Sequence, residues 1–490
     1  MTIKAILQVF LIFASLYVFL MGVVKGFSGN EAELILVVSV QAYLLVLIGI
    51  INIRKIGKAQ EVLLLIVSLS IVWIVVRSLF IVADYESVNY QYILPADITS
   101  LSFTIFMIML STIFLCGGVI VGYSFQKSEI KKSHVSSNEI YFITVYFVLT
   151  LLWSISQKWL LGSQDGSSTL VSLIAIIFSP DIMLLLFVST VVYVFGNLSK
   201  MQRYTVLGVL VFFVIARVSV GSKGGVFVLF VLFLIALLSY RSQIAIPKRA
   251  LGILALLFPI SILLFFVGHG IRLYYSEFSD SGLTLSSIIS KAGVIWSYST
   301  NLEGQQAGTL VEMLSRRLSM LDYLYVCFNA TPTGDQLGLV YQMKAIVNII
   351  FPGLPFEEAK YFSARLFKVA YGIADYRAIV DNYHTDMLPV FGWLFLNLGS
   401  ISIVALFLFG TIVGFFYRKL CSVNTKYSFF YRIMFLYFFA DLVFGMGLDS
   451  TMQQFIIFSI IPFSLYRIVK YFYSQLSRIL VRNMKEMKVS

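Results

Sequence analysis

Residues 1–24 read MTIKAILQVFLIFASLYVFLMGVV, a stretch long and apolar enough to cross a lipid bilayer as a single helix. The hydrocarbon core of a bilayer is about 30 Å thick and takes about 20 apolar residues in a helix. The stretch is too long for a secretory signal peptide and lacks a small-residue cleavage site. We therefore interpret it as a retained first transmembrane helix.

Similar apolar stretches recur along the chain of 490 residues, of which 59% are hydrophobic and only 12% are charged. A soluble domain has about 25% charged residues, so this composition indicates that lipid surrounds much of the surface. We predict an all-α polytopic membrane protein with about a dozen transmembrane helices. The predicted spans are 4–24, 34–53, 62–82, 101–123, 140–160, 181–196, 204–220, 224–240, 250–267, 388–416, 428–447 and 453–473.

The short loops between these spans alternate in charge, which predicts their orientation by the positive-inside rule. Lysine and arginine gather in loops such as 54–58 and 418–426, whereas Glu31 and Glu33 lie in a loop of the other set. We therefore expect both termini on the cytoplasmic side. The net charge of +12 follows from this asymmetry, so we expect no nucleic-acid partner.

The same pattern divides the chain into two membrane parts and two hydrophilic parts. Residues 1–267 hold the first nine predicted spans, and residues 388–473 hold the last three. Between them, residues 268–387 are rich in charge and are expected outside the membrane, where helical apolar spacing predicts a helical subdomain. Residues 474–490 are predicted to form a basic cytoplasmic tail.

Basic side chains on the outer side of the membrane are candidate binding residues, and those near the turn between spans seven and eight depart from the positive-inside rule. They are Arg217 and Lys223, near the turn between spans seven and eight, with Arg272, Arg316 and Arg317 in the large outer segment. The planar guanidinium group matches phosphate oxygens, so we expect these residues to bind a pyrophosphate headgroup whose lipid tail stays in the bilayer. A solvated or salt-bridged surface role is the alternative for each.

His384 is the candidate general base. It lies about one turn before the tenth predicted span, at the outer interface. Imidazole titrates near neutrality and suits removal of a proton from a hydroxyl, and Asp381 or Asp386 could orient the ring. A histidine that caps the helix or binds a headgroup is the alternative. Because nucleotide-binding and metal-binding motifs are absent from the sequence, we predict no cofactor and no metal ligand.

Two short motifs and the overall architecture resemble the bacterial O-antigen polymerases, also called Wzy-type oligosaccharide repeat-unit polymerases. One motif is Arg217 with the SKGG turn at 222–225, although Lys223 stands where that group more usually has arginine. The other is YHTDMLPVFGWLFLNLG at 383–399, similar to the family's His-x-x-x-Leu followed by an apolar helix broken by glycine. A more distant similarity is to the O-antigen ligases.

The resemblance implies a fold of the lipid-dependent glycosyltransferase type in the bacterial inner membrane. It implies donor and acceptor substrates linked to undecaprenyl pyrophosphate, joined on the periplasmic face, and a partner protein that regulates chain length. His384 would be the base, and the outer basic residues would stabilise the charge on the departing pyrophosphate. A lipid-linked oligosaccharide flippase or transporter and an O-antigen ligase remain the alternatives. A flippase is expected to carry charge through the middle of its bundle.

Overall fold

The computed structural model describes residues 3–53, 59–83, 98–125, 199–219, 290–299, 320–329, 389–422 and 428–444, together with Gly57 and a few isolated positions. Within these ranges the regular structure is helical, and no strand occurs. Five helical segments there are long and apolar enough to cross a membrane. The coarse prediction of an all-α membrane protein is therefore confirmed.

The first four predicted spans coincide with helical segments of the structure. The third of these segments is continuous but changes from α-helix to a short π-helical turn and back. The bounds are Ile3–Ser28 for α1, Glu31–Asn52 for α2, Ala59–Ser70 for α3, Ile71–Val75 for the π-helical turn η1, Val76–Ala83 for α4 and Ile98–Ser124 for α5.

The structure divides the predicted span 388–416 into two helices. Helix α19 (Val390–Leu398) ends at Gly399, and a 3-10 turn, η6 (Gly399–Ile401), leads into α20 (Ser402–Ser422). Gly399 has a φ of 55°, which lies in the left-handed region that glycine enters without a steric penalty. This non-helical conformation ends α19 and explains why one apolar stretch forms two helices.

Four further helices are described. They are α9 (Lys200–Ser219), α13 (Ala292–Ser299), α15 (Leu321–Asn329) and α21 (Ser428–Phe444). Helices α9 and α21 correspond to predicted spans, whereas α13 and α15 lie in the charged segment 268–387. The remaining predicted spans, 140–160, 181–196, 224–240, 250–267 and 453–473, lie outside the described residues except for isolated positions, so the total of about 12 spans stays a prediction.

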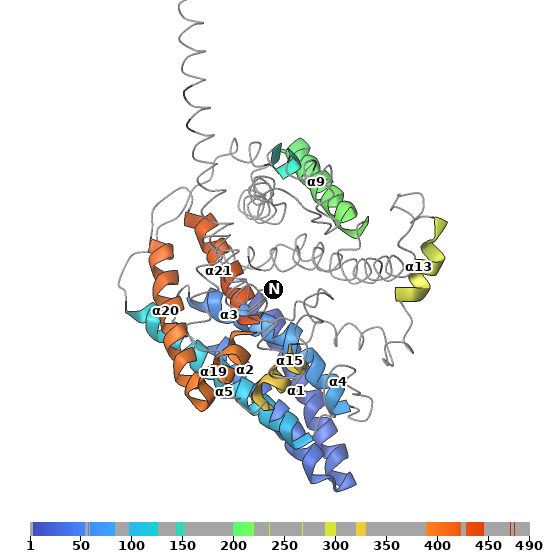
Figure 1. Cartoon of the computed structure of the whole chain (residues 1–490), viewed down its shortest axis with the longest axis vertical. Helices are drawn as coiled ribbons and strands as arrows, with labels where there is room; N and C mark the ends of the chain where they lie inside the picture. Colours follow the sequence, from blue (N-terminus) through green and yellow to red (C-terminus); the bar gives the residue numbers. More distant parts are fainter. Residues whose placement is uncertain are drawn as a thin grey trace, which may run out of the picture.

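Helices α5 and α20 form the most extensive contact between described helices (Figure 1). Four glycines at two G-x-x-x-G spacings lie in this contact: Gly118 and Gly122 on α5, Gly410 and Gly414 on α20. A Cβ atom built on any of them would overlap a backbone carbonyl of the other helix. Small residues at this spacing allow the backbones of membrane helices to approach closely.

The two helices of this pair run in the same direction. Gly118 faces the backbone of Phe407, and Gly122, one turn later, faces that of Thr411. Because residue numbers rise together along both helices, α5 and α20 are parallel and end on the same side of the bundle.

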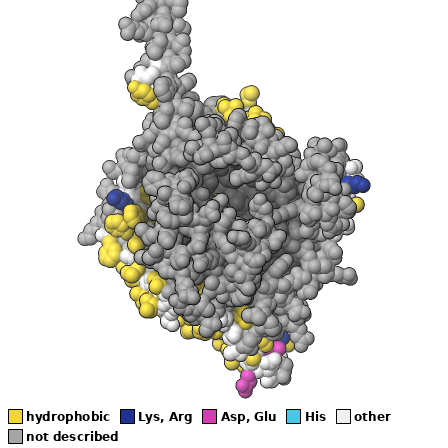
Figure 2. All heavy atoms as spheres, in the orientation of Figure 1, with side chains coloured by type: hydrophobic (Ala, Val, Ile, Leu, Met, Phe, Trp, Pro, Cys, Tyr) yellow, Lys and Arg dark blue, Asp and Glu magenta, His cyan; other side chains and the backbone are white. Residues whose placement is uncertain are grey.

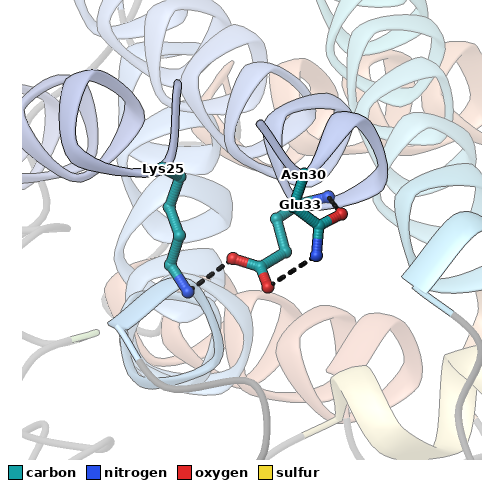
Figure 3. A network of polar contacts seen from close by, with 3 residues as sticks. All are labelled: Lys25, Asn30 and Glu33. Atoms are coloured by element: carbon teal, nitrogen blue, oxygen red, sulfur yellow. Dashed lines mark hydrogen bonds and ion pairs between the residues drawn. The ribbon is translucent and has the colours of Figure 1, made fainter. Parts of the chain in front are cut away.

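Helices α1 and α2 form a tight hairpin beside this pair, with α2 packed on α5 (Figure 1). Asn30 caps α2: its Oδ1 accepts the Glu33 N–H at 3.3 Å, and its Nδ2 donates to Glu33 Oε1 at 2.9 Å. The Lys25 ammonium lies 2.5 Å from Glu33 Oε2 and ties the end of α1 to the same turn (Figure 3). Side-chain caps of this kind satisfy backbone donors that a helix leaves free at its start.

Apolar side chains line the visible outer edge of the described helices (Figure 2). Phe13 and Phe19 on α1, Val38 on α2 and Leu408 on α20 are all exposed. Large continuous apolar surfaces are rare on soluble monomers, so this surface indicates a lipid environment.

Candidate functional site

The two ends of the bundle differ in charge. Helices α5 and α20 both run toward one end, where α20 carries Arg418 and Lys419 close to its C-terminus. Gly57, between α2 and α3, lies at the same end, because a Cβ there would be 3.6 Å from the Tyr123 hydroxyl of α5. We call this the basic end, and the other, where α1 meets α2, the opposite end.

Two irregularities of the backbone lie near the middle height of the bundle. The π-helical turn η1 occupies the centre of the segment that runs from Ala59 to Ala83. Because Gly118 faces Phe407, the start of α20 at Ser402 is level with residue 113, near the middle of α5. The break before α20 is therefore also near mid-height. Discontinuous helices near the bilayer midplane are where many membrane proteins place their binding sites.

Helix α15 enters the bundle at this same height. The Met320 N–H, just before α15, donates to the Trp73 carbonyl oxygen of η1 at 2.9 Å. At the other end of α15, the Asn329 amide donates to Thr104 Oγ1, close to the start of α5, at 3.0 Å. Its nine residues are about 13 Å long, roughly half a bilayer. Helix α15 therefore extends from mid-height to the opposite end.

The apolar face of α15 packs against α5 and α19. Leu321, Leu324 and Cys327 are fully buried. A Cβ atom on Gly392 of α19 would lie 2.7 Å from the Cys327 sulfur, so only glycine lets the two helices come this close. We call the point where the start of α15 meets η1 the mid-height junction.

Arg77 lies one helical turn beyond Trp73, on α4, in the half of the bundle that leads to the opposite end. Arg77 is 1% exposed, so its guanidinium group is buried beside the mid-height junction. Charged groups at membrane depth are costly and are usually retained for function. The sequence places Arg77 among the basic residues on the outer side of the membrane, but it is not one of the candidate binding residues that we chose from the sequence.

A second polar cluster lies at the basic end. The Tyr417 hydroxyl on α20 donates to the buried Glu61 carboxylate on α3. Arg432 on α21, also buried, interacts electrostatically with both and hydrogen-bonds the Cys421 sulfur. This cluster joins α3, α20 and α21. Beside it, the Arg418 guanidinium lies over the Tyr123 ring, 4.7 Å from its centroid, which adds a cation–π contact between α20 and α5.

The candidate residues chosen from the sequence are only partly placed by the structure. Arg217 lies in the last turn of α9, and its side chain is outside the described residues. Lys223, Arg272, Arg316, Arg317 and His384 also lie outside them, so the predicted site stays a prediction. Among the described residues, no group of three or more His, Cys, Asp or Glu side chains is arranged to hold a metal ion.

No family model, curated protein or solved structure matches this chain.

Proposed function

We propose that the chain is a glycosyltransferase that polymerises oligosaccharide repeat units linked to undecaprenyl pyrophosphate. The reaction would take place on the periplasmic face of the bacterial inner membrane and build O-antigen or a related surface polysaccharide. The buried guanidinium of Arg77, beside the mid-height junction and on the side of the opposite end, is the observation that carries this proposal.

The depth of Arg77 suits a lipid diphosphate. Arg77 precedes the end of α4 at Ala83 by six residues, which is about 9 Å along the helix. An arginine side chain is long enough to place its charge nearer the interface than its Cα atom. A diphosphate whose polyprenyl tail remains in the same leaflet would therefore be within reach of this half of the bundle.

The proposed reaction needs no nucleotide, because the donor already carries its leaving group. A hydroxyl of the acceptor sugar attacks the anomeric carbon of the donor glycan, and the bond from that carbon to the pyrophosphate oxygen breaks. The hydroxyl proton passes to His384, and undecaprenyl pyrophosphate departs with the bonding electrons. Arginines fixed in a partly dehydrated site stabilise this developing charge, the role we assign to Arg217, Arg272 and Arg317. Lys223 and Arg316 would support them.

A lipid-linked oligosaccharide flippase is the second candidate function. The helix break at Gly399 and the entry of α15 at mid-height both favour it, since transporters build substrate sites at broken helices. The burial of the Arg77 guanidinium near mid-height also agrees with the charge expected inside the bundle of a flippase. The charged segment 268–387 favours the polymerase, because catalysis on the outer face needs polar groups there.

Deletion of the gene and electrophoresis of the lipopolysaccharide separate these functions. Loss of a polymerase should leave lipid core bearing a single repeat unit, whereas loss of a flippase or an O-antigen ligase should leave bare core. A mutant that keeps its full ladder of chain lengths would overturn the polymerase proposal.

Arg77→Lys tests the residue that carries the proposal. Lysine keeps the charge but loses the planar fork of donors, so we expect shortened or absent ladders at an unchanged protein level. Arg432→Lys is the matched control, because Arg432 is also buried but lies at the basic end. Equal losses in both variants would assign Arg77 a structural role only.

A further inference from the structure

The π-helical turn η1 places one extra residue in the path of its span. The Val76 N–H bonds to the Ile71 carbonyl, five residues back, instead of the four of an α-helix. Every residue beyond the turn is therefore offset by one position from its place in a regular helix, which is about 100° of rotation and 1.5 Å of rise. Single π-helical turns of this kind are rare and occur frequently at functional sites.

Helix α15 is attached to this turn. The Met320 N–H donates to the Trp73 carbonyl within η1, so a donor from a distant part of the chain bonds a carbonyl of the irregular turn. Insertion of an outside group into the ladder of helix hydrogen bonds is a recognised cause of local distortion. At its other end α15 is held by Asn329 on Thr104. The contact with η1 therefore depends on the docking of α15 as a whole.

We propose that docking of α15 maintains the π-helical turn and thereby fixes the rotational position of Arg77. When α15 undocks, η1 relaxes to α-helix and α4 advances by one residue position. Arg77 then moves to the place of Ser78, and Ser78 moves to the half-buried place of Leu79. Helix α15 belongs to the segment 268–387. A contact of this segment that undocks α15 therefore changes the position of the buried Arg77 guanidinium. The coupling itself does not require the proposed polymerase activity.

Cys327 is a natural reporter of docking. It is fully buried, with Gly392 of α19 against its sulfur. In a chain carrying Cys116→Ser and Cys421→Ser, the rate at which N-ethylmaleimide modifies Cys327 in membranes measures how often α15 leaves its position.

Met320→Pro tests the contact with η1 directly. Proline has no N–H, and it is tolerated at the start of a helix. One hydrogen bond contributes about 1 kcal/mol, so we expect the modification rate of Cys327 to rise about five-fold. Met320→Leu keeps the N–H and a similar volume and should leave the rate unchanged. An unchanged rate in Met320→Pro would overturn the proposal.

A second reporter follows the rotation of α4. Ser78 is 2% exposed, and Ser78→Cys in a chain otherwise free of cysteine should be protected from N-ethylmaleimide. When Met320→Pro is added, the thiol should become reactive, because it moves to a half-buried position. If Cys327 is released in Met320→Pro while the thiol at position 78 stays protected, docking of α15 does not control α4 and the proposal fails.

Deletion of Val72 gives an independent test of the coupling. The deletion removes the extra residue of η1, so the span can become a regular helix with α3 and α4 still in their present positions. We expect Cys327 to be released in this variant, and Met320→Pro to add no further effect. The opposite result is a double variant in which the modification rate of Cys327 rises by the product of the two single increases. That result would show that docking and the π-helical turn are independent, and it would overturn the proposal.

Each of these tests measures a cysteine modification rate and not polymerase activity. Failure of the coupling proposal therefore does not contradict the polymerase proposal. Unaltered lipopolysaccharide ladders, in turn, do not contradict the coupling of α15 to Arg77.

Discussion

Replacement of Gly118 by alanine should loosen the bundle at its closest helix contact. The new methyl group would overlap the Phe407 carbonyl oxygen and lie 2.9 Å from the Thr411 nitrogen. Both atoms belong to the backbone of α20, so no side chain can move aside. The neighbouring Gly117 is the matched control, because a Cβ there meets only the Phe407 ring, at 3.8 Å.

The expected cost follows from this geometry. A methyl carbon and a carbonyl oxygen lie about 3.3–3.6 Å apart in ordinary close contact, so α5 and α20 must separate by about 1 Å. Overpacking of this kind costs about 1–3 kcal/mol, and separation also weakens the close Cα–H···O contacts along the pair, at about 0.5–1 kcal/mol each. Alanine regains up to about 1 kcal/mol of helix propensity. The net expectation for Gly118→Ala is a loss of about 2 kcal/mol, whereas Gly117→Ala should be neutral or slightly stabilising.

Thermal unfolding in detergent, followed with a dye that fluoresces on reaction with thiols, measures this difference. The signal is suitable because Cys116, Cys327 and Cys421 are all buried. Gly118→Ala should lower the melting temperature by roughly 2–3 °C relative to Gly117→Ala, because the unfolding entropy of a 490-residue chain is about 1 kcal/mol/K. Gly410→Ala should do the same from the other helix. In the double variant the decrease in melting temperature should be smaller than the sum of the two single decreases, because the first methyl group already separates the helices. Equal melting of the Gly117 and Gly118 variants would refute close parallel packing of α5 and α20.

Tyr417→Phe removes a hydroxyl donor from the buried Glu61 carboxylate, so we expect a loss of about 1–3 kcal/mol in the same melting assay, and an unchanged melting temperature would contradict a buried cluster at the basic end. Glu33→Gln removes the ion pair with Lys25 at a partly exposed turn, where such pairs contribute at most about 1 kcal/mol, so its melting curve should overlay that of the parent chain. Val340→Cys should react with a membrane-impermeant maleimide from the periplasmic side only, and reaction from the cytosol would reverse the predicted orientation.

The long helices could be predicted from the sequence because each is a single apolar run of sufficient length. Hydropathy over about 20 residues depends only on local composition, which is why α2 and α5 appear within a few residues of the predicted bounds. The glycines of the closest contact also leave a sequence signal. Residues 118–122 read GVIVG and residues 410–414 read GTIVG, two G-x-x-x-G motifs that identify helix contacts in membranes.

The mid-height junction could not be predicted in the same way. The π-helical turn η1 and the docked α15 are joined by a hydrogen bond between Trp73 and Met320, which are far apart in the sequence. Hydropathy reports that Trp73 lies in an apolar run, but not that its carbonyl bonds another segment. Similarly, the chain is apolar on both sides of the break at Gly399, so hydropathy averaged over about 20 residues does not reveal the break.

The parallel arrangement of α5 and α20 constrains the topology more firmly than hydropathy does. Helix α5 leads toward the basic end, and α20, which begins at mid-height, leads toward the same end. The chain leaves α5 on one side of the membrane and reaches α20 from the other side. It must therefore cross the membrane an odd number of times between the two helices. Five spans are predicted between α5 and α20, which is an odd number. Four or six spans would not satisfy the condition. The contact of four glycines thus supports placing the charged segment 268–387 on the side of the membrane where the opposite end lies, which is the side toward which α4 leads from Arg77.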